Sequence, residues 1–556
     1  MRKEYALEKI ELFNEKYLNN DQKLIAKGII NSIPEGQDVQ GYLDFILKRT
    51  GLGFKFDISP EIANGWVGII YEIEKMRINV KEVSAENENK LIIGDNYECL
   101  KNLLLTHKEK IDVIYIDPPY NTSSAHTDGN ESSKLGGGGS YSRFVYKDKF
   151  GRNGWLNLMR DRLYLAKKLL SHEGIIFISI DDSEQAYLKV LMDDIFGEEN
   201  FVNQLVWVSN KKGRQISGKM FAKTYEYILV YAKDISTINK FEILKDEAQK
   251  LMPKIYEKRN EEILKDEYSE FIIQNELHNT NIKEFNEITR KNLRFPIYTN
   301  GKDFSVVKKD EWKEIWPPKN KDGIGAVWRW QKSKVESESF NLYAEPNKSS
   351  YKIFTKKRDF VYTAKDIIIS SSMTTKSGSS QLESIGMGNS FQFPKPTSLI
   401  KFLISSFKKD ATILDFFAGS GTTGQAVMEL NKEDQGCRNF ILCTNNENNI
   451  ALEVTYERLF RLINGKGTKE ETFDWIEKNE PFNNENLRVF ALNHYDVSIA
   501  SKEKIDNLKE IAFRNLKLLS NNYKNKEIDI FYDLSGLNPY NNFQKSEILN
   551  EVKKWL

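Results

Sequence analysis

Four consecutive residues, Asp117-Pro118-Pro119-Tyr120, could activate an amine that is a poor nucleophile. The lone pair of an exocyclic amine is delocalised into its aromatic ring, and two hydrogen-bond acceptors against its N–H bonds would draw the nitrogen toward a reactive geometry. The Asp117 carboxylate is one such acceptor, and the Pro118 carbonyl, restricted by the two prolines, is the other. Tyr120 offers a flat face on which an extruded base can stack. A strand-ending turn with a capping aspartate is the plainer interpretation.

A second segment, Asp415-Phe416-Phe417-Ala418-Gly419-Ser420-Gly421, is rich in glycine and precedes a helix-like stretch. Glycines at a strand-to-helix turn let a ligand approach the backbone near a helix N-terminus. The Asp415 carboxylate could accept a hydrogen bond from the ammonium group of a cofactor. The expected cofactor-binding residues here are Asp415, Phe417, Gly419 and Gly421. No Gly-Lys-Ser/Thr follows, which excludes a phosphate-binding P-loop, but a dinucleotide-binding loop or a plain tight turn stays open.

Short apolar runs that alternate with helix-like stretches must position these two segments. The runs are Leu91–Ile93, Val113–Ile116, Ile175–Ile180, Ile228–Tyr231, Thr412–Leu414 and Asn439–Cys443. This alternation predicts an α/β fold, with a mostly parallel sheet and helices on both faces. Such sheets bind ligands at the carboxyl ends of their strands, where both segments would lie. The two must share one crevice for any joint chemistry.

The rest of the chain divides by pattern and charge. We expect a helical N-terminal region at 1–85, a catalytic half at 86–235, an inserted module at 236–390, a cofactor-binding half at 391–483 and a C-terminal region with helical stretches at 484–556. The net charge is only +1, yet residues 291–365 hold 17 Lys/Arg against 9 Asp/Glu, together with Trp312, Trp316, Trp328 and Trp330. This local excess predicts a nucleic-acid-binding surface, with a solvated basic face as the alternative.

Composition favours an ordinary globular protein, because 40% of the residues are hydrophobic and 29% are charged. No run approaches the ~20 apolar residues that cross a bilayer, and the first residues lack a secretory signal. Three cysteines without CxxC spacing predict neither disulfides nor a metal site, so we expect a cytoplasmic protein. The segment Gly136–Ser140 matches a flexible linker.

Several ordered blocks of this chain resemble the β-class amino-methyltransferases, and more narrowly the modification subunits of type III restriction–modification systems. The resemblance covers roughly residues 85 to 465. It rests on Ile92–Asn96, Asp117–Asn121, Gly154–Met159 with Arg162-Leu163, Gly174–Asp182, Phe196–Phe201, Tyr225–Tyr231, Phe393–Pro396 with Leu399-Ile400, and the glycine-rich segment.

The resemblance implies a Rossmann-like methyltransferase that uses S-adenosyl-L-methionine. Asp95 would contact the cofactor adenine, and Asp117 would lie against the cofactor as well as the substrate. An acid after the run Phe440–Cys443 should bind the ribose; Thr444-Asn445-Asn446 intervene, and Glu447 is the nearest. Tyr225, where the family often has His, would contact a flipped base together with Tyr120.

The same resemblance implies the substrate and the partners. The substrate would be adenine N6 in double-stranded DNA, read by a target-recognition domain at 236–390. The chain would work as a homodimer, and a separate restriction (helicase–nuclease) subunit could join it.

Single residues separate this chemistry from its alternatives. Cytosine C5 methylation uses a Pro-Cys nucleophile, and none of Cys99, Cys437 and Cys443 follows a proline. Cytosine N4 methylation commonly has Ser where this chain has Asp117, which favours adenine but leaves cytosine N4 open. The long insertion and the block order argue against RNA or protein amide methylation. A DNA-binding scaffold without catalysis is the alternative from another class, against which intact Asp117, Tyr120 and Asp415 speak.

Overall fold

A computed structural model describes the chain in two compact units, residues 1–239 with 365–556 and residues 240–364. The described residues are 3–12, 20–34, 37, 39, 42–43, 62–80, 88–121, 145–211, 221–244, 262–279, 281–348, 350–359, 361–496, 502–521, 523 and 534–537. The linker-like segment Gly136–Ser140 lies outside them.

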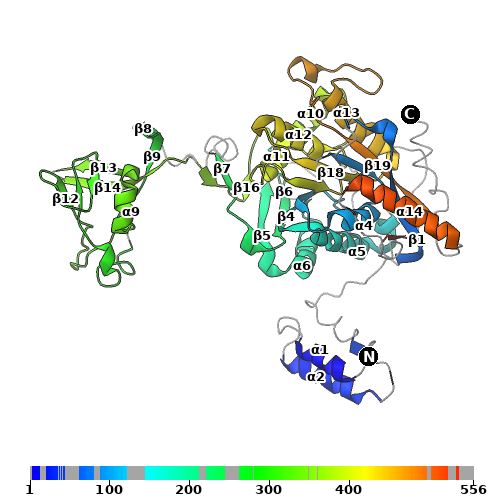
Figure 1. Ribbon diagram of the computed structural model, residues 1–556, viewed down its shortest axis with the longest axis horizontal. Helices are drawn as coiled ribbons and strands as arrows, with labels where there is room; N and C mark the ends of the chain where they lie inside the picture. The colour runs from blue at the N-terminus through cyan, green and yellow to red at the C-terminus, as the bar shows by residue number, and fades with distance from the viewer. Residues whose placement is uncertain are drawn as a thin grey trace. The chain divides into compact units, whose positions relative to one another are not determined.

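The larger unit is built on an 11-stranded sheet (Figure 1). In spatial order its strands are β16 (Ile367–Ile368), β5 (Phe201–Trp207), β6 (Glu226–Ala232), β4 (Leu170–Ile180), β3 (Ile111–Ile116), β17 (Thr412–Asp415), β18 (Asn439–Thr444), β2 (Lys90–Ile93), β19 (Arg488–Asp496), β1 (Ile62–Glu72) and β20 (Ser535–Leu537). From β4 through β19 all neighbours are parallel, whereas β6 is antiparallel to β4 and β5, and β1 is antiparallel to β19 and β20.

Helices cover both faces of this sheet (Figure 1). One group is α4 (Asn96–His107), α5 (Val145–Leu169), α6 (Gln185–Phe196) and α14 (Lys502–Leu519). The other is α10 (Thr375–Ser384), α11 (Thr397–Ser405), α12 (Thr422–Asp434) and α13 (Glu457–Asn464). Because both faces are covered, the central strands β2 and β18 are buried at every position and read as continuous apolar runs.

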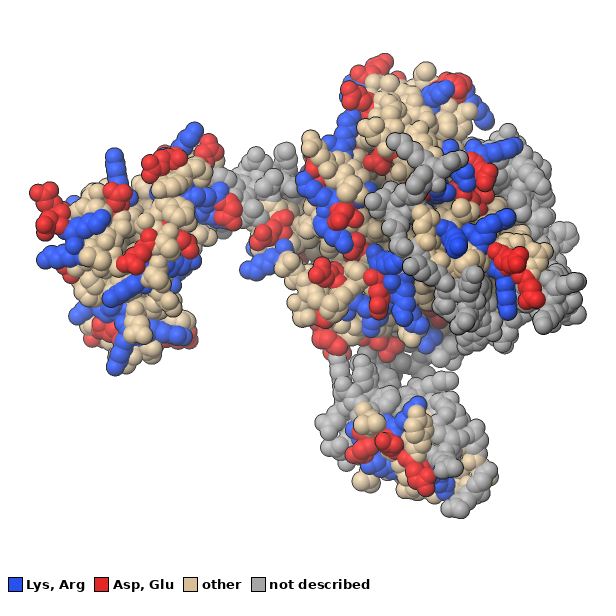
Figure 2. All heavy atoms as spheres, viewed as in Figure 1, with Lys and Arg blue, Asp and Glu red and all other residues tan. Residues whose placement is uncertain are grey.

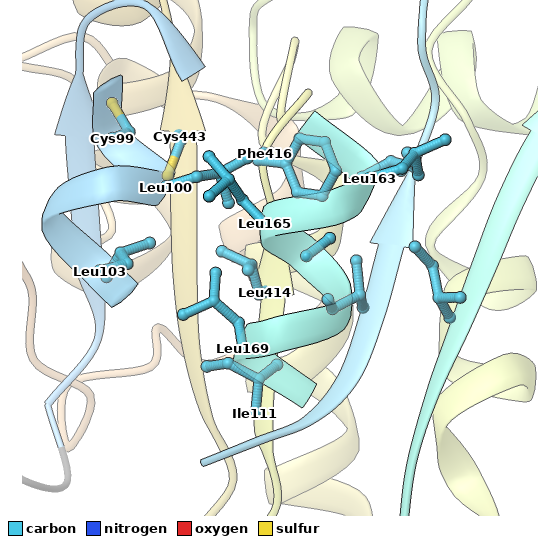
Figure 3. Close-up of a cluster of buried hydrophobic side chains, with 14 of the residues drawn as sticks. Cys99, Leu100, Leu103, Ile111, Leu163, Leu165, Leu169, Leu414, Phe416 and Cys443 are labelled. Atoms are coloured by element: carbon cyan, nitrogen blue, oxygen red, sulfur yellow. The ribbon is translucent and has the colours of Figure 1, made fainter. Parts of the chain in front are cut away.

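The main core lies between α4, α5 and the central strands. Figure 3 shows Leu163 and Leu169 of α5 beside Leu414 of β17, with Cys99 and Cys443 next to each other. Each fully buried side chain of this kind contributes about 1.5–3 kcal/mol. This burial fixes the strands whose ends carry the two motifs. The helices α1 (Lys3–Leu12) and α2 (Asn20–Ser32) form a separate small core.

The smaller unit contains short antiparallel sheets. A four-stranded sheet has the order β13 (Leu342–Asn347), β14 (Ser350–Lys357), β9 (Glu270–Glu276) and β8 (Leu264–Lys265). A three-stranded sheet has the order β11 (Phe304–Ser305), β10 (Ile297–Thr299) and β12 (Lys313–Ile315), and β15 (Val361–Thr363) pairs with β7 (Glu242–Leu244). Helix α9 (Lys332–Ser337) joins their core through Val335.

The predicted α/β fold is confirmed, and each of the six apolar runs forms a strand of the main sheet. One terminal expectation needs correction, and the other terminal region contributes a strand as well as a helix. Within 1–85, which the pattern predicts to be helical, residues 62–72 form β1, and within 484–556 the strand β19 lies beside β2 in the main sheet. Their partners are distant in sequence, so local pattern does not reveal the pairing that buries them.

The inserted module is shorter than expected. The sequence pattern predicts it at 236–390, whereas the smaller unit spans 240–364. Residues 365–390 belong to the larger unit because β16 extends the main sheet parallel to β5, with the Val206 N–H donating to the Asp366 carbonyl at 2.7 Å. In the described part of the chain, every helix is too short or too polar to cross a membrane.

Candidate active site

The two motifs share one edge of the sheet. Strands β3 and β17 are parallel neighbours, with Val113 beside Ile413 and Ile114 beside Leu414. Asp117 therefore follows one strand and Asp415 ends the next at the same carboxyl edge. The expectation that both open into one crevice agrees with this register, although 298 positions separate the two aspartates (415 − 117). This is the edge at which open α/β sheets bind ligands.

Four polar side chains converge at the end of β3. The ammonium group of Lys395 donates to both Asp117 carboxylate oxygens at 2.8 and 2.7 Å and to the Tyr120 hydroxyl oxygen at 2.9 Å. The Tyr120 hydroxyl is 2.9 Å from Asp117 Oδ1 and 2.9 Å from Glu226 Oε2. Lys395 Nζ is also 3.6 Å from Glu226. We call Asp117, Tyr120, Glu226 and Lys395 the acidic cluster.

Burial and the nearby carboxylates together determine the protonation of Lys395 and Tyr120. Burial by itself would lower the pKa of Lys395, but the nearby charges of Asp117 and Glu226 outweigh it and raise that pKa. Burial, together with the same two carboxylates, raises the pKa of Tyr120 well above its usual value. Lys395 is therefore an ammonium ion and Tyr120 a neutral phenol near pH 7.

The loop after β3, residues 117–121, is held from two sides. The Trp155 indole N–H in α5 donates to the Pro119 carbonyl at 2.6 Å. The Asn121 amide donates to Glu184 at 2.7 Å, and Asn121 has a φ of 51°, which asparagine tolerates better than most residues. These contacts hold the peptides after Asp117, so the loop does not depend on a bound ligand for its shape.

Asp415 lies at the base of the glycine-rich loop. Its carboxylate accepts from the Thr423 hydroxyl at 2.6 Å and from the Phe417 N–H at 3.0 Å. Burial raises the pKa of Asp415 to about 7, and these two hydrogen bonds lower it less than burial raises it. A buried carboxylate of this kind is stabilised as an anion by a bound cation.

The conformation of this loop requires glycine at two positions. Gly419 and Gly421 have φ values of 49° and 75°, and Gly421 is the N-cap of α12. A Cβ at Gly419 would lie 3.2 Å from the Phe391 ring, and one at Gly421 would lie 3.2 Å from Thr455 Cγ2. The loop is thus closely surrounded at these two positions, and a larger residue at either would have to displace a neighbour.

Two residues of the helical segment that follows β18 donate hydrogen bonds to the glycine-rich loop. Thr455, in the π-helical turn Ile450–Tyr456, donates to the Gly419 carbonyl at 2.6 Å. Arg458 is fully buried and donates to the Ser420 carbonyl at 3.1 Å and the Thr422 hydroxyl at 2.9 Å. Burial lowers the pKa of Arg458 to about 10, which still leaves it charged near neutrality.

Asp95 follows strand β2, which β18 separates from β17 in the sheet. It caps α4 by accepting from the Tyr97 N–H at 2.9 Å, and buried Arg162 of α5 donates to both of its oxygens at 3.1 and 3.0 Å. Arg162 also bonds the Asn96 amide, which donates to the Phe416 carbonyl at 2.8 Å. One arginine therefore links the loops after β2 and β17.

The remaining expected residues lie apart from the acidic cluster. Glu447 begins a short helical turn just beyond β18, on the carboxyl edge. Tyr225 is 38% exposed and packs edge-on against Tyr227, with 5.4 Å between ring centroids. Glu226, between those tyrosines, contacts Tyr120 instead, because successive side chains of a strand point to opposite faces.

Sequence reasoning missed four residues of this site. Glu226, Lys395, Arg162 and Arg458 received no chemical role, although the first three lie within blocks that carry the family resemblance. One signal was available for two of them: Glu226 begins an apolar strand and Lys395 lies between Pro394 and Pro396, so both are charged residues next to apolar or rigid segments. Nothing local marks which partners they meet.

Comparison with known proteins places these features in a family. The DNA methylase family covering N6 and N4 amino-methyltransferases matches residues 111–457, and a family of uncharacterised conserved proteins matches residues 3–113. The type III restriction-modification enzyme EcoPI Mod subunit of Escherichia phage P1 is 33% identical over 69% of this chain, which spans 62% of that subunit.

Two further relatives are covered more fully. The type II methyltransferase M.KpnI of Klebsiella pneumoniae is 32% identical over 71% of this chain and 90% of its own length. The type III restriction-modification enzyme StyLTI Mod subunit of Salmonella typhimurium is 30% identical over 90% of this chain and 74% of its own length. The match therefore includes both motifs and the unit between them.

Proposed function

The chain belongs to the DNA methylase family of N6 and N4 amino-methyltransferases, and we propose that it methylates adenine N6 in double-stranded DNA as the modification subunit of a restriction–modification system. The observation that carries this proposal is the register of β3 against β17, which brings the Asp117 motif and the glycine-rich loop to one edge. A methyl acceptor and a methyl donor must meet at such a place.

S-adenosyl-L-methionine is the cofactor that fits the glycine-rich edge. It supplies a methyl carbon bonded to a positively charged sulfur. Asp415, a buried carboxylate whose pKa is raised to about 7, suits the ammonium group of the cofactor, and Gly419 and Gly421 in the same loop lack side chains that would hinder its approach to the backbone. Asp95 contacts the adenine of the cofactor, and Glu447 binds its ribose. Phe417 contacts the cofactor from the glycine-rich loop.

The substrate amine is handled by the Asp117 loop. The Asp117 carboxylate accepts one N–H of the adenine amine and the Pro118 carbonyl accepts the other. The Pro119 carbonyl already accepts from Trp155, which orients the peptides on either side of Pro119. The base has to leave the duplex to reach this loop, at a cost of a few kcal/mol. Stacking on Tyr120, worth about 1–3 kcal/mol, offsets part of that cost, and Tyr225 adds a second aromatic contact at the rim.

DNA is read by the smaller unit, residues 240–364. Figure 2 shows many Lys and Arg side chains on it, with acidic ones between them. Lys309 lies 4.3 Å from the Trp312 ring and Lys334 lies 4.8 Å from the Trp330 ring, whereas Trp328 is a core residue. Exposed cations beside aromatic rings suit phosphate and base contacts together. The chain works in the cytoplasm as a homodimer that a separate restriction subunit can join.

Methyl transfer to genomic DNA tests the proposal. Purified protein is incubated with labelled S-adenosyl-L-methionine and unmodified DNA, and modified bases are mapped by sequencing. We expect N6-methyladenine at one recurring sequence. Modified cytosine, or no transfer to DNA at all, would contradict the proposal.

Asp117→Ala separates catalysis from cofactor binding. It should abolish transfer, because the amine loses its charged acceptor, while cofactor affinity measured by calorimetry stays within a few-fold. Asp112→Asn is the matched control: Asp112 lies at the other end of β3 and accepts from the Thr412 N–H. An equal loss of cofactor affinity and activity in Asp117→Ala would show that Asp117 acts through the cofactor instead.

A further inference from the structure

The acidic cluster has fewer protons than pairs of oxygen atoms at hydrogen-bond distance, which suggests a role besides binding the substrate amine. A lysine ammonium has three N–H donors, and Lys395 has three acceptors within 2.9 Å: both Asp117 oxygens and the Tyr120 hydroxyl oxygen. A phenol has one O–H donor. Tyr120, however, has carboxylate oxygens of Asp117 and Glu226 each at 2.9 Å. One of these two oxygen–oxygen pairs therefore has no proton between its atoms.

Methylation produces the proton that this pair can accept. When the substrate amine gains a methyl group, its nitrogen becomes positively charged and one N–H proton must leave while that bond's electron pair stays on nitrogen. We propose that Glu226 receives this proton through Tyr120; this proposal rests on the proposed function. Lys395 is then the positioning residue that holds Asp117 in place for the transfer.

The steps balance without another reactant. The amine proton passes to an Asp117 oxygen, which neutralises that carboxylate. Asp117 then gives a proton to the Tyr120 oxygen as the phenol gives its own proton to Glu226 Oε2. Tyr120 ends as it began, Asp117 is an anion again and Glu226 carries the proton. The Glu226 side chain is 19% exposed, so the proton can then pass to solvent.

The charge states of Tyr120 and Lys395 suit this route. The raised pKa of Tyr120 keeps the phenol protonated, so it can donate toward Glu226. The raised pKa of Lys395 keeps all three ammonium donors in place. Tyr115 and Asp415 are the other titratable groups that act on the acidic cluster, and Tyr115 is already bonded to Ser179 at 2.9 Å.

Two nearly isosteric variants test the transfer. Glu226→Gln keeps an acceptor for the phenol but cannot take a carboxylate proton, and Tyr120→Phe keeps the stacking ring but removes the hydroxyl. We expect each to slow single-turnover methylation by about tenfold or more. The double variant should be no slower than either, because both interrupt one path. Additive losses, or wild-type rates in both single variants, would overturn the proposal.

A measurement without turnover excludes a merely structural effect. DNA that carries 2-aminopurine at the target position becomes fluorescent when the base is extruded, and it can be titrated in the presence of S-adenosylhomocysteine. Both variants should extrude and bind this DNA within twofold of wild type. A loss of extrusion that matches the loss of rate would assign Tyr120 and Glu226 to base binding and refute the proton path.

Variants with and without a positive charge at position 395 test the role of Lys395. Lys395→Met should lower kcat with little change in KM for DNA, and Lys395→Arg should recover part of the rate. Lys401→Met is the matched control, since Lys401 lies in α11 between Glu429 and Glu433 at 3.1 and 2.5 Å and should leave transfer unchanged. Equal rates for the Met and Arg variants would overturn the role of the charge. A wild-type chain that methylates no adenine would instead refute the proposed function.

Discussion

Asp117 is embedded in charge to an extent that its motif alone does not suggest. It shares Lys395 with Glu226, so two carboxylates surround one ammonium group. The Lys395 ammonium group and the Tyr120 hydroxyl both donate to the Asp117 carboxylate, so its oxygens are held in place. At the residue scale the site is therefore an ion cluster, in which Asp117 is held by Tyr120 of its own loop and by Lys395 from the segment before α11.

Asp415 makes cofactor affinity depend on pH. Its pKa is raised to about 7 in the free protein, mainly by burial, so the carboxyl is protonated below pH 7 and anionic above it. An ammonium ligand favours the anion. We therefore expect affinity for S-adenosylhomocysteine to be highest above pH 7 and to fall up to about tenfold per pH unit below it. Calorimetry between pH 5.5 and 8.5 measures this dependence.

Asp415→Asn is the control for that dependence. It should bind more weakly at pH 8 and lose most of the change below pH 7; parallel curves for the two proteins would rule out Asp415. The raised pKa also affects stability. The folded state binds this proton more tightly than the unfolded chain, so the contribution of Asp415 to the free energy of unfolding declines as pH rises from about 4 to about 7.

At the scale of elements, the glycine-rich turn between β17 and α12 is held by its neighbours. The Gly419 carbonyl accepts from Thr455, and Arg458 bonds the Ser420 carbonyl, so the segment after β18 supports the loop after β17. Thr455 lies in a π-helical turn, and such turns are frequent at functional sites. We expect these contacts to hold the loop in one conformation without a ligand, which would reduce the entropy that binding must lose.

Gly421→Ala tests this rigidity. At a φ of 75° an alanine is strained by about 1–2 kcal/mol, and its Cβ would press on Thr455. We expect the free energy of unfolding to fall by about that amount and cofactor affinity to drop. Gly28→Ala in α2 is the comparison, because nothing lies within 4 Å of its Cβ position and alanine favours helices by about 1 kcal/mol. Chemical denaturation should therefore give opposite signs; equal signs would contradict the strain argument.

At the scale of the whole molecule, chemistry and recognition belong to separate units if the smaller unit reads DNA, as proposed above. The larger unit holds both motifs, whereas residues 240–364 have their own core of Leu277, Phe295 and Trp328. This division allows the DNA sequence that is read to change without altering the catalytic edge. Affinity for DNA should accordingly depend on the basic surface of the smaller unit.

The salt dependence of DNA binding locates that surface. Replacing Lys309, Lys332 and Lys334 with Gln should weaken binding to all sequences and reduce the slope of log K against log salt by about 0.9 for each phosphate that the variant no longer neutralises. Fluorescence anisotropy between 50 and 300 mM salt measures the slope. Lys469→Gln, an exposed position in the larger unit, is the control. An unchanged slope in the triple variant would move the DNA surface elsewhere.

The central strands and the two motifs could be predicted from the amino-acid sequence alone. The central strands β2, β3, β17 and β18 are covered on both faces, so their apolar runs predicted them directly. The Asp117 motif and the glycine-rich segment were recognisable because their chemistry depends on adjacent residues. Glycine at positions 419 and 421 indicated a backbone that other residues rarely adopt.

Tertiary structure alone decided the rest. The strands β1 and β19, expected within terminal regions, join the main sheet because pairing with distant strands buries them. Glu226 reaches Tyr120, and Lys395 reaches Asp117, only when β6 and the segment before α11 come to the end of β3. Local sequence encodes the backbone preference of each segment, but a salt bridge between residues 117 and 395 depends on the order of strands, which no local pattern specifies.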